Sequence, residues 1–115
     1  MSDQVEIQIP KTIWPEETTF TATAYFRTRA TKVALAPTTV HYRIDCLKTR
    51  KEIVDWTSVT TGANVDIVLT ATHNQILEEQ SRLERKQLTV QADQGLSTQV
   101  NGVVVYKIRN LQGIV

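Results

Sequence analysis

The chain has 115 residues, of which 41% are hydrophobic and 22% charged, and its formal net charge is +1 at pH 7. This length suits one domain, residues 1–115, and the composition excludes a disordered chain. No stretch approaches the roughly 20 apolar residues of a membrane-spanning helix, and the basic residues are scattered among carboxylates, so we expect neither a membrane nor a nucleic acid as a partner.

Apolar and polar side chains alternate with a period of two along most of the chain. This period places successive side chains on opposite faces and predicts half-buried β-strands. Residues 40–46 show it best, with a predicted inner face of Val40, Tyr42, Ile44 and Cys46. About seven strands are predicted in all. In chain order they cover residues 5–9, 19–27, 40–46, 52–56, 65–71, 88–92 and 103–109.

Two segments between these strands carry signals of their own. Residues 72–85 break the period of two, and Thr72 with Gln75 fits a capping box at the start of a helix. We therefore predict one short helix there, between the fifth and sixth strands. Asn101 and Gly102 favour a tight hairpin turn, because both residues tolerate positive φ. That turn either closes a hairpin before the last strand or ends a longer loop.

Short strands separated by turn residues predict an all-β fold, either a sandwich or a small barrel. A helical crossover between the fifth and sixth strands favours an immunoglobulin-like or fibronectin-III-like β-sandwich. The paired cysteines and the corner tyrosine of antibody domains are missing, since Cys46 is the one cysteine. The acidic N-terminus does not resemble a secretory signal. We therefore expect a protein without disulfides, made in a reducing cytoplasm.

No set of residues predicts catalysis, a cofactor or a metal site, and we expect the protein not to be an enzyme. Cys46 and His41 have opposite parity on one strand, so they cannot act as nucleophile and base. His41 and Asp45 share a face but lie about 13 Å apart, too far to hold one metal ion, and are expected to be solvated or to form cross-strand charge pairs. The same solvated ion-pair interpretation applies to the densest carboxylates, which are Glu78, Glu79 and Glu84.

The last strand is apolar on both faces, which is typical of a strand that is covered on both sides. Its core face would carry Val104, Tyr106 and Ile108, so that Val103 and Val105 point outward. Two explanations stay open: the N-terminal strand or the connection at residues 12–17 folds over these valines, or a partner subunit covers them. The candidate interface comprises Val103, Val105, Leu111, Ile114 and Val115.

A second candidate surface consists of end loops, which commonly carry recognition in sandwiches. Its candidate contacts are Val33, Leu35, Leu96 and Val100. Local packing of these residues is the competing interpretation.

Three segments, residues 9–15, 19–28 and 40–46, together resemble small proteins from the structural modules of tailed bacteriophages. The resemblance implies an immunoglobulin-like virion component on the capsid, at the head–tail junction or in the tail. Its expected partners are other virion structural proteins and further copies of itself, and its expected location is the virion, assembled in the host cytoplasm. The alternative is a ligand- or carbohydrate-recognition module with Trp14, Trp56 or Tyr25 as aromatic platforms, and a cytosolic scaffold domain is a third interpretation.

Overall fold

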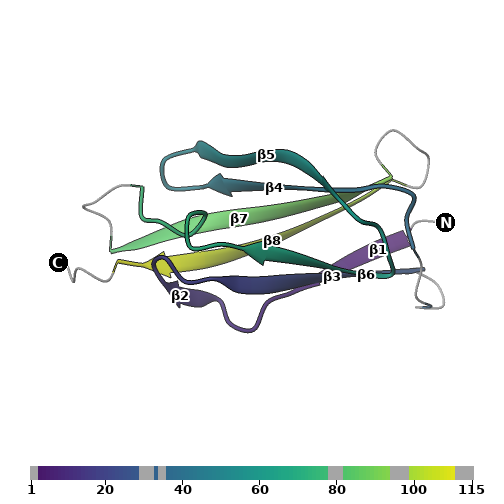
Figure 1. Cartoon of the computed structure of the whole chain (residues 1–115), viewed down its shortest axis with the longest axis horizontal. Coiled ribbons are helices and arrows are strands. Elements are labelled where there is room, and N and C mark those ends of the chain that lie inside the picture. Colours follow the sequence, from purple (N-terminus) through teal and green to yellow (C-terminus); the bar gives the residue numbers. More distant parts are fainter. Residues whose placement is uncertain (1–2, 29–32, 34–35, 78–81, 94–98, 111–115) are drawn as a thin grey trace.

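The computed structural model describes residues 3–28, 33, 36–77, 82–93 and 99–110 (Figure 1). These residues form an all-β structure, with principal extents of 48 × 24 × 21 Å. Its strands are β1 (Asp3–Gln8), β2 (Ile13–Pro15), β3 (Phe20–Thr28), β4 (Val40–Cys46), β5 (Lys51–Val59), β6 (Asn64–Leu69), β7 (Leu83–Ala92) and β8 (Val100–Arg109).

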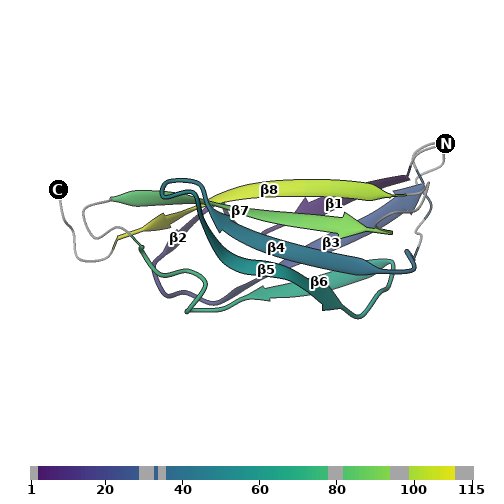
Figure 2. The ribbon, with the colours of Figure 1, turned by 90° about the horizontal axis from the view of Figure 1, so that it is seen from above.

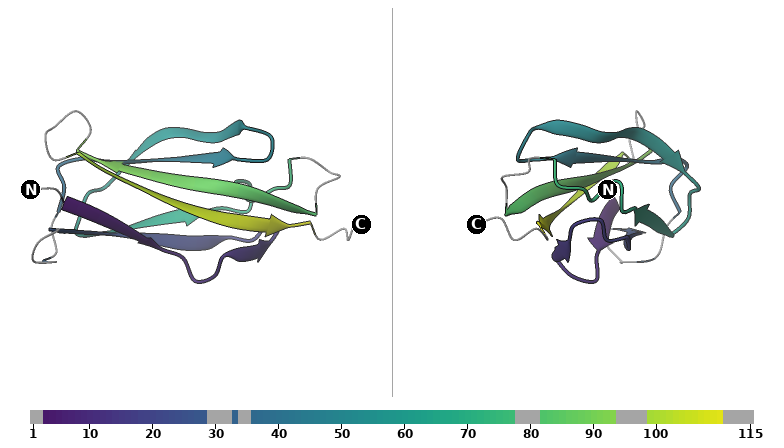
Figure 3. Two further views of the ribbon diagram at one scale, coloured as in Figure 1. Left: turned by 180° about the vertical axis from the view of Figure 1, so that it is seen from behind. Right: turned by 60° about the vertical axis from the view of Figure 1, so that its left-hand side comes forward.

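The strands form two sheets that face each other (Figure 3). One sheet has three strands in the order β1-β3-β6, and the other has five in the order β2-β8-β7-β4-β5. Figure 2 shows β8, β7, β4 and β5 side by side. All pairs are antiparallel except β2 with β8, which is parallel. The chain therefore changes sheets between β1 and β2, around Pro10.

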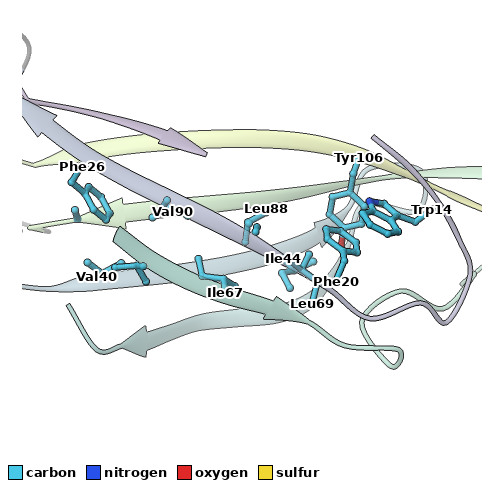
Figure 4. Packing of buried hydrophobic residues seen from close by; sticks show 14 of the residues in the cluster. Trp14, Phe20, Phe26, Val40, Ile44, Ile67, Leu69, Leu88, Val90 and Tyr106 are labelled. Atoms are coloured by element: carbon cyan, nitrogen blue, oxygen red, sulfur yellow. The ribbon is translucent and has the colours of Figure 1, made fainter. Parts of the chain in front are cut away.

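The core lies between the sheets, and the period of two predicted most of its apolar members. β3 and β6 bury alternate residues from one sheet, while β4, β7 and β8 bury theirs from the other (Figure 4). The fully or nearly buried apolar residues of these strands are Phe20, Ala22, Ala24, Phe26, Val40, Ile44, Cys46, Val65, Ile67, Leu69, Leu88, Val90, Ala92, Tyr106 and Ile108. A two-sheet all-β fold, which is consistent with a β-sandwich, is thus confirmed.

Three aromatic rings close one end of this core (Figure 4). Trp14 stacks on Phe20 with ring centroids 4.3 Å apart, and Phe20 meets Tyr106 edge-on at 5.2 Å. The indole N–H of Trp14 donates to the Lys11 carbonyl at 2.8 Å. Aromatic pairs of this kind add about 0.5–1.5 kcal/mol beyond their area burial. Trp14 is therefore a core residue, and residues 13–15 form strand β2 rather than the predicted connection.

The helix predicted over residues 72–85 is wrong for the part that the structure describes. Residues 71–74 form a turn, and β7 already begins at Leu83, while residues 78–81 lie outside the described ones. β7 pairs with β4 on one side and β8 on the other. These ladders override the local capping signal, because tertiary context outweighs weak helix propensity.

The hairpin turn predicted at Asn101-Gly102 is also wrong. Both residues lie inside β8, where Gly102 pairs with Val90. A Cβ at position 102 would come within 2.5 Å of the Val5 Cγ1 atom on β1. The glycine is therefore explained by the close approach of the two sheets at this point, a known use of glycine within strands.

Candidate functional site

The outer face of β8 carries an uncovered row of apolar side chains. Val103 is 55% exposed and Val105 is 36% exposed, whereas Tyr106 and Ile108 on the opposite face are fully buried. The predicted orientation of the strand is thus confirmed. Ile13 on β2, which is 38% exposed, pairs with Lys107 and extends the row. We call Ile13, Val103 and Val105 the β8 apolar row.

The described part of the N-terminal region does not cover this row. β2 lies beside β8 in the same sheet, and its register begins only at the Ile13–Lys107 pair. β1 belongs to the other sheet and approaches β8 from the core side, at Gly102. The first explanation for the apolar outer face of β8, that the N-terminal strand or the connection covers it, therefore does not hold for the described residues.

The other predicted contact residues do not gather into one described site. Leu111, Ile114 and Val115 lie outside the described residues, as do Leu35 and Leu96. Val33 is 58% exposed. Val100 is half-buried and packs against the core, so it follows the local-packing interpretation.

The charged face of β4 forms ion pairs. The Arg43 guanidinium lies 3.0 Å from Asp45 on the same strand and 3.2 Å from Glu52 on β5. The hydrogen bond to Asp45 raises the pKa of Arg43. The Arg43–Glu52 pair is a cross-strand charge pair of the predicted kind, whereas the partner of Asp45 lies on its own strand. His41 lies on this outer face and Cys46 is buried on the inner one, so the two do not meet.

A buried polar cluster next to the aromatic end of the core was missed from sequence. Glu84 and Lys86 are both fully buried, and the Lys86 Nζ atom lies 3.4 Å from Glu84 Oε1. Lys86 also donates to the Gln75 carbonyl at 2.7 Å, and Glu84 accepts from the Leu77 N–H at 2.9 Å. The thiol of Cys46 lies 3.8 Å from Glu84. Solvation of Glu84 on a helix surface, as predicted, is therefore wrong.

Asn74 links this region to the core. Its side chain donates to the Thr18 carbonyl at 2.6 Å and accepts the Tyr106 hydroxyl hydrogen at 3.0 Å. Burial, with a smaller contribution from nearby Cys46, raises the pKa of Tyr106. The Asn74 side chain thus holds the turn at residues 71–74 against Thr18 and β8.

One sequence signal could have revealed the buried pair. Glu84 and Lys86 continue the inward period of Leu88 and Val90, so they fall on the core face once residues 83–92 are assigned to one strand. Because both charged groups are fully buried, no dissolved substrate reaches them. We therefore interpret the pair as part of the fold and not as a reaction centre.

The described residues contain no group of three His, Cys, Asp or Glu side chains placed to hold a metal ion. No helix in this part of the chain is long and apolar enough to cross a membrane. Comparison with known proteins finds no family model that matches the sequence and no curated protein that is similar to it.

Proposed function

We propose that this chain is a non-enzymatic structural protein of a tailed bacteriophage virion, acting through contacts with copies of itself and with other virion proteins. Its position would be on the capsid, at the head–tail junction or in the tail. The observation that carries the proposal is the β8 apolar row, with Val103 55% exposed on an otherwise well-packed sheet. Apolar side chains in a row on an exposed strand favour pairing with another chain.

The proposed fold is an immunoglobulin-like sandwich without a disulfide, and the described residues between β6 and β7 form no helix. Support comes from the division of the strands into β1-β3-β6 and β2-β8-β7-β4-β5, and from the first segment of the chain, which contributes one strand to each sheet. Two largely antiparallel sheets that enclose alternating inward residues are typical of this architecture. The resemblance of residues 9–15, 19–28 and 40–46 to phage structural proteins points the same way.

Detection of the protein in particles tests this function. Virions are purified from the phage or induced prophage that encodes the chain, and their proteins are identified by mass spectrometry and located with antibody labelling in the electron microscope. We expect the protein at a fixed copy number relative to the major capsid or tail protein. Absence from purified particles, together with a failure of the free protein to bind them, would refute the proposal.

A carbohydrate-binding module is the second candidate, and exposed Trp56 on edge strand β5 favours it. Trp56 is 41% exposed, whereas Trp14 is buried in the core and cannot serve as a platform. Trp56→Ala should therefore leave the fold intact. Glycan-array binding by the wild type that disappears in Trp56→Ala would support this candidate over the virion role.

A further inference from the structure

The two sheets have four edges, and three of them carry features that discourage strand pairing. Charged side chains and register shifts are the common means by which proteins protect an edge. β5 shows register shifts against β4 and exposes Lys51, Glu52 and Asp55. The two edges of the three-stranded sheet also carry charged residues, which are Glu6 on β1 and Asp66 on β6.

The fourth edge is the first half of β8, and it has none of these features. β2 pairs with β8 only from Lys107 onward, so residues 100–106 have a hydrogen-bonded strand neighbour, β7, on one side only, while β1 of the other sheet packs close to β8 at Gly102. This segment reads Val-Asn-Gly-Val-Val-Val-Tyr and contains no charge, no proline and no register shift. An uncharged edge of this kind, without a register shift, is a template for an added strand.

The main-chain groups that face this open edge can be assigned from the neighbouring ladder. The Lys107 N–H donates to the Thr12 carbonyl at 2.7 Å and the Arg109 carbonyl accepts from the Glu16 N–H at 2.9 Å, so these residues point their main-chain groups toward β2. Alternate residues of an antiparallel strand direct both groups to the same side. The N–H and C=O groups of Asn101, Val103 and Val105 therefore point out of the open edge.

We infer that this open edge pairs with the same edge of a second copy of the chain, antiparallel and with its twofold axis at Val103. This inference rests on the proposed function and names the first partner in its assembly. In this register Val103 opposes Val103 of the second copy, and Asn101 opposes Val105 twice. Each such pair exchanges two hydrogen bonds, which gives about six in all. The two five-stranded sheets become one continuous sheet.

Self-complementarity is the reason for choosing a second copy as the occupant. The open stretch of edge-facing residues, 101–105, has Val103 at its centre and ends where β2 begins, so one antiparallel register pairs all three edge-facing residues of each copy. No charged side chain lies in residues 100–106, so no like charges are brought together in this register. The valines of the two β8 apolar rows then lie beside each other on the same outer face.

Light scattering and amide hydrogen exchange test the pairing on the full chain. We expect the molar mass to rise from 13.0 kDa toward twice that value as the concentration increases from micromolar to millimolar. The Val103 and Val105 amides should gain protection from exchange in parallel with this rise. A strict monomer, or a dimer in which these two amides stay unprotected, would overturn the inference.

Two substitutions sharpen the test. Val103→Lys brings two lysines together at the twofold axis and should move the onset of dimerisation upward by about tenfold or more in concentration. The matched control is Val68→Lys on β6, where a valine 48% exposed lies on the other sheet, and its dimerisation should equal that of the wild type. Equal behaviour of the two lysine variants would contradict the proposed register.

A cysteine at position 103 gives a readout that does not depend on the fold tolerating a lysine. Directly opposed residues in a hydrogen-bonded pair have Cα atoms about 5.5 Å apart, which suits a disulfide. Val103→Cys should therefore form a covalent dimer under mild oxidation, whereas Val68→Cys should not, and native Cys46 is fully buried. No excess of crosslinking in Val103→Cys would count against the pairing.

The particle experiment and the dimerisation experiments test different claims and can have different outcomes. A protein that is present in virions but strictly monomeric in solution, with its β8 amides protected only in the particle, would overturn the second-copy inference and leave the virion role standing. A protein that dimerises through β8 and is absent from virions would do the reverse.

Discussion

Replacement of Lys86 by methionine is the most informative test of how this fold is held together. Methionine keeps most of the length and apolar volume of the side chain but removes the ammonium group. Glu84 is then left fully buried and charged, without the cation that lies 3.4 Å away in the wild type. The Gln75 carbonyl also loses the hydrogen bond that Lys86 donates at 2.7 Å.

The expected loss in free energy of unfolding is large. Removing one partner of a buried ion pair costs about 3–5 kcal/mol, because the remaining buried charge loses its oppositely charged neighbour. Since a domain has about 5–15 kcal/mol in total, the variant loses a substantial fraction of its stability. At about 4 °C per kcal/mol for a chain of this size, the midpoint of thermal unfolding should fall by about 12–20 °C.

The double variant Glu84→Gln/Lys86→Met tests whether the stability loss of Lys86→Met comes from the buried Glu84 charge that has lost its cation. In the wild type, the Leu77 N–H donates to Glu84 at 2.9 Å. The glutamine oxygen can still accept this hydrogen bond, but the site then carries no charge. We expect the double variant to regain at least about 2 kcal/mol relative to Lys86→Met alone, because a neutral replacement of both partners costs far less than a broken pair. Urea unfolding followed by circular dichroism measures all of these differences.

The exposed pair of Arg43 and Asp45 supplies the control. Arg43→Met removes an ion pair of the same kind in solvent, where such pairs contribute little, and its unfolding midpoint should stay close to that of the wild type. A Lys86→Met variant as stable as Arg43→Met would refute the reasoning. A double variant no more stable than Lys86→Met would refute it as well.

Two further predictions concern the core side of β8. The Tyr106 phenol has a raised pKa in the folded state, so stability should be unaffected below pH 10, where the unfolded phenol also keeps its proton, and should fall as the pH rises above that value. Tyr106→Phe should cost about 1 kcal/mol at neutral pH and show a shallower alkaline loss in urea unfolding; equal slopes would contradict this. Gly102→Ala should destabilise by about 1–3 kcal/mol, because the new methyl group would come within 2.5 Å of Val5. Val5→Ala should relieve that loss in calorimetry, and a Gly102→Ala variant with wild-type stability would show that the sheets have room.

The period of two was sufficient to assign most strands and their inward residues. In β3, β4 and the second half of β7, each side chain alternates cleanly between an apolar interior and a polar exterior, so the core face follows from the sequence alone. The outward orientation of Val103 and Val105 was available for the same reason. The sequence pattern did not reveal the family of the protein, because the apolar residues that fill a sandwich core are interchangeable and carry no chemical signature.

Long-range pairing decided what local patterns could not. Residues 72–85 carry helix signals, yet β4 and β8 on either side of β7 impose extended structure from Leu83 onward. Asn101-Gly102 carries a turn signal, yet both residues pair with β7 inside β8, and Gly102 lies against Val5 of β1. Burial of Glu84 with Lys86 likewise depends on which strands close over them. The open edge of β8 exists only because the chain changes sheets near Pro10, and no alternation within one segment contains that information.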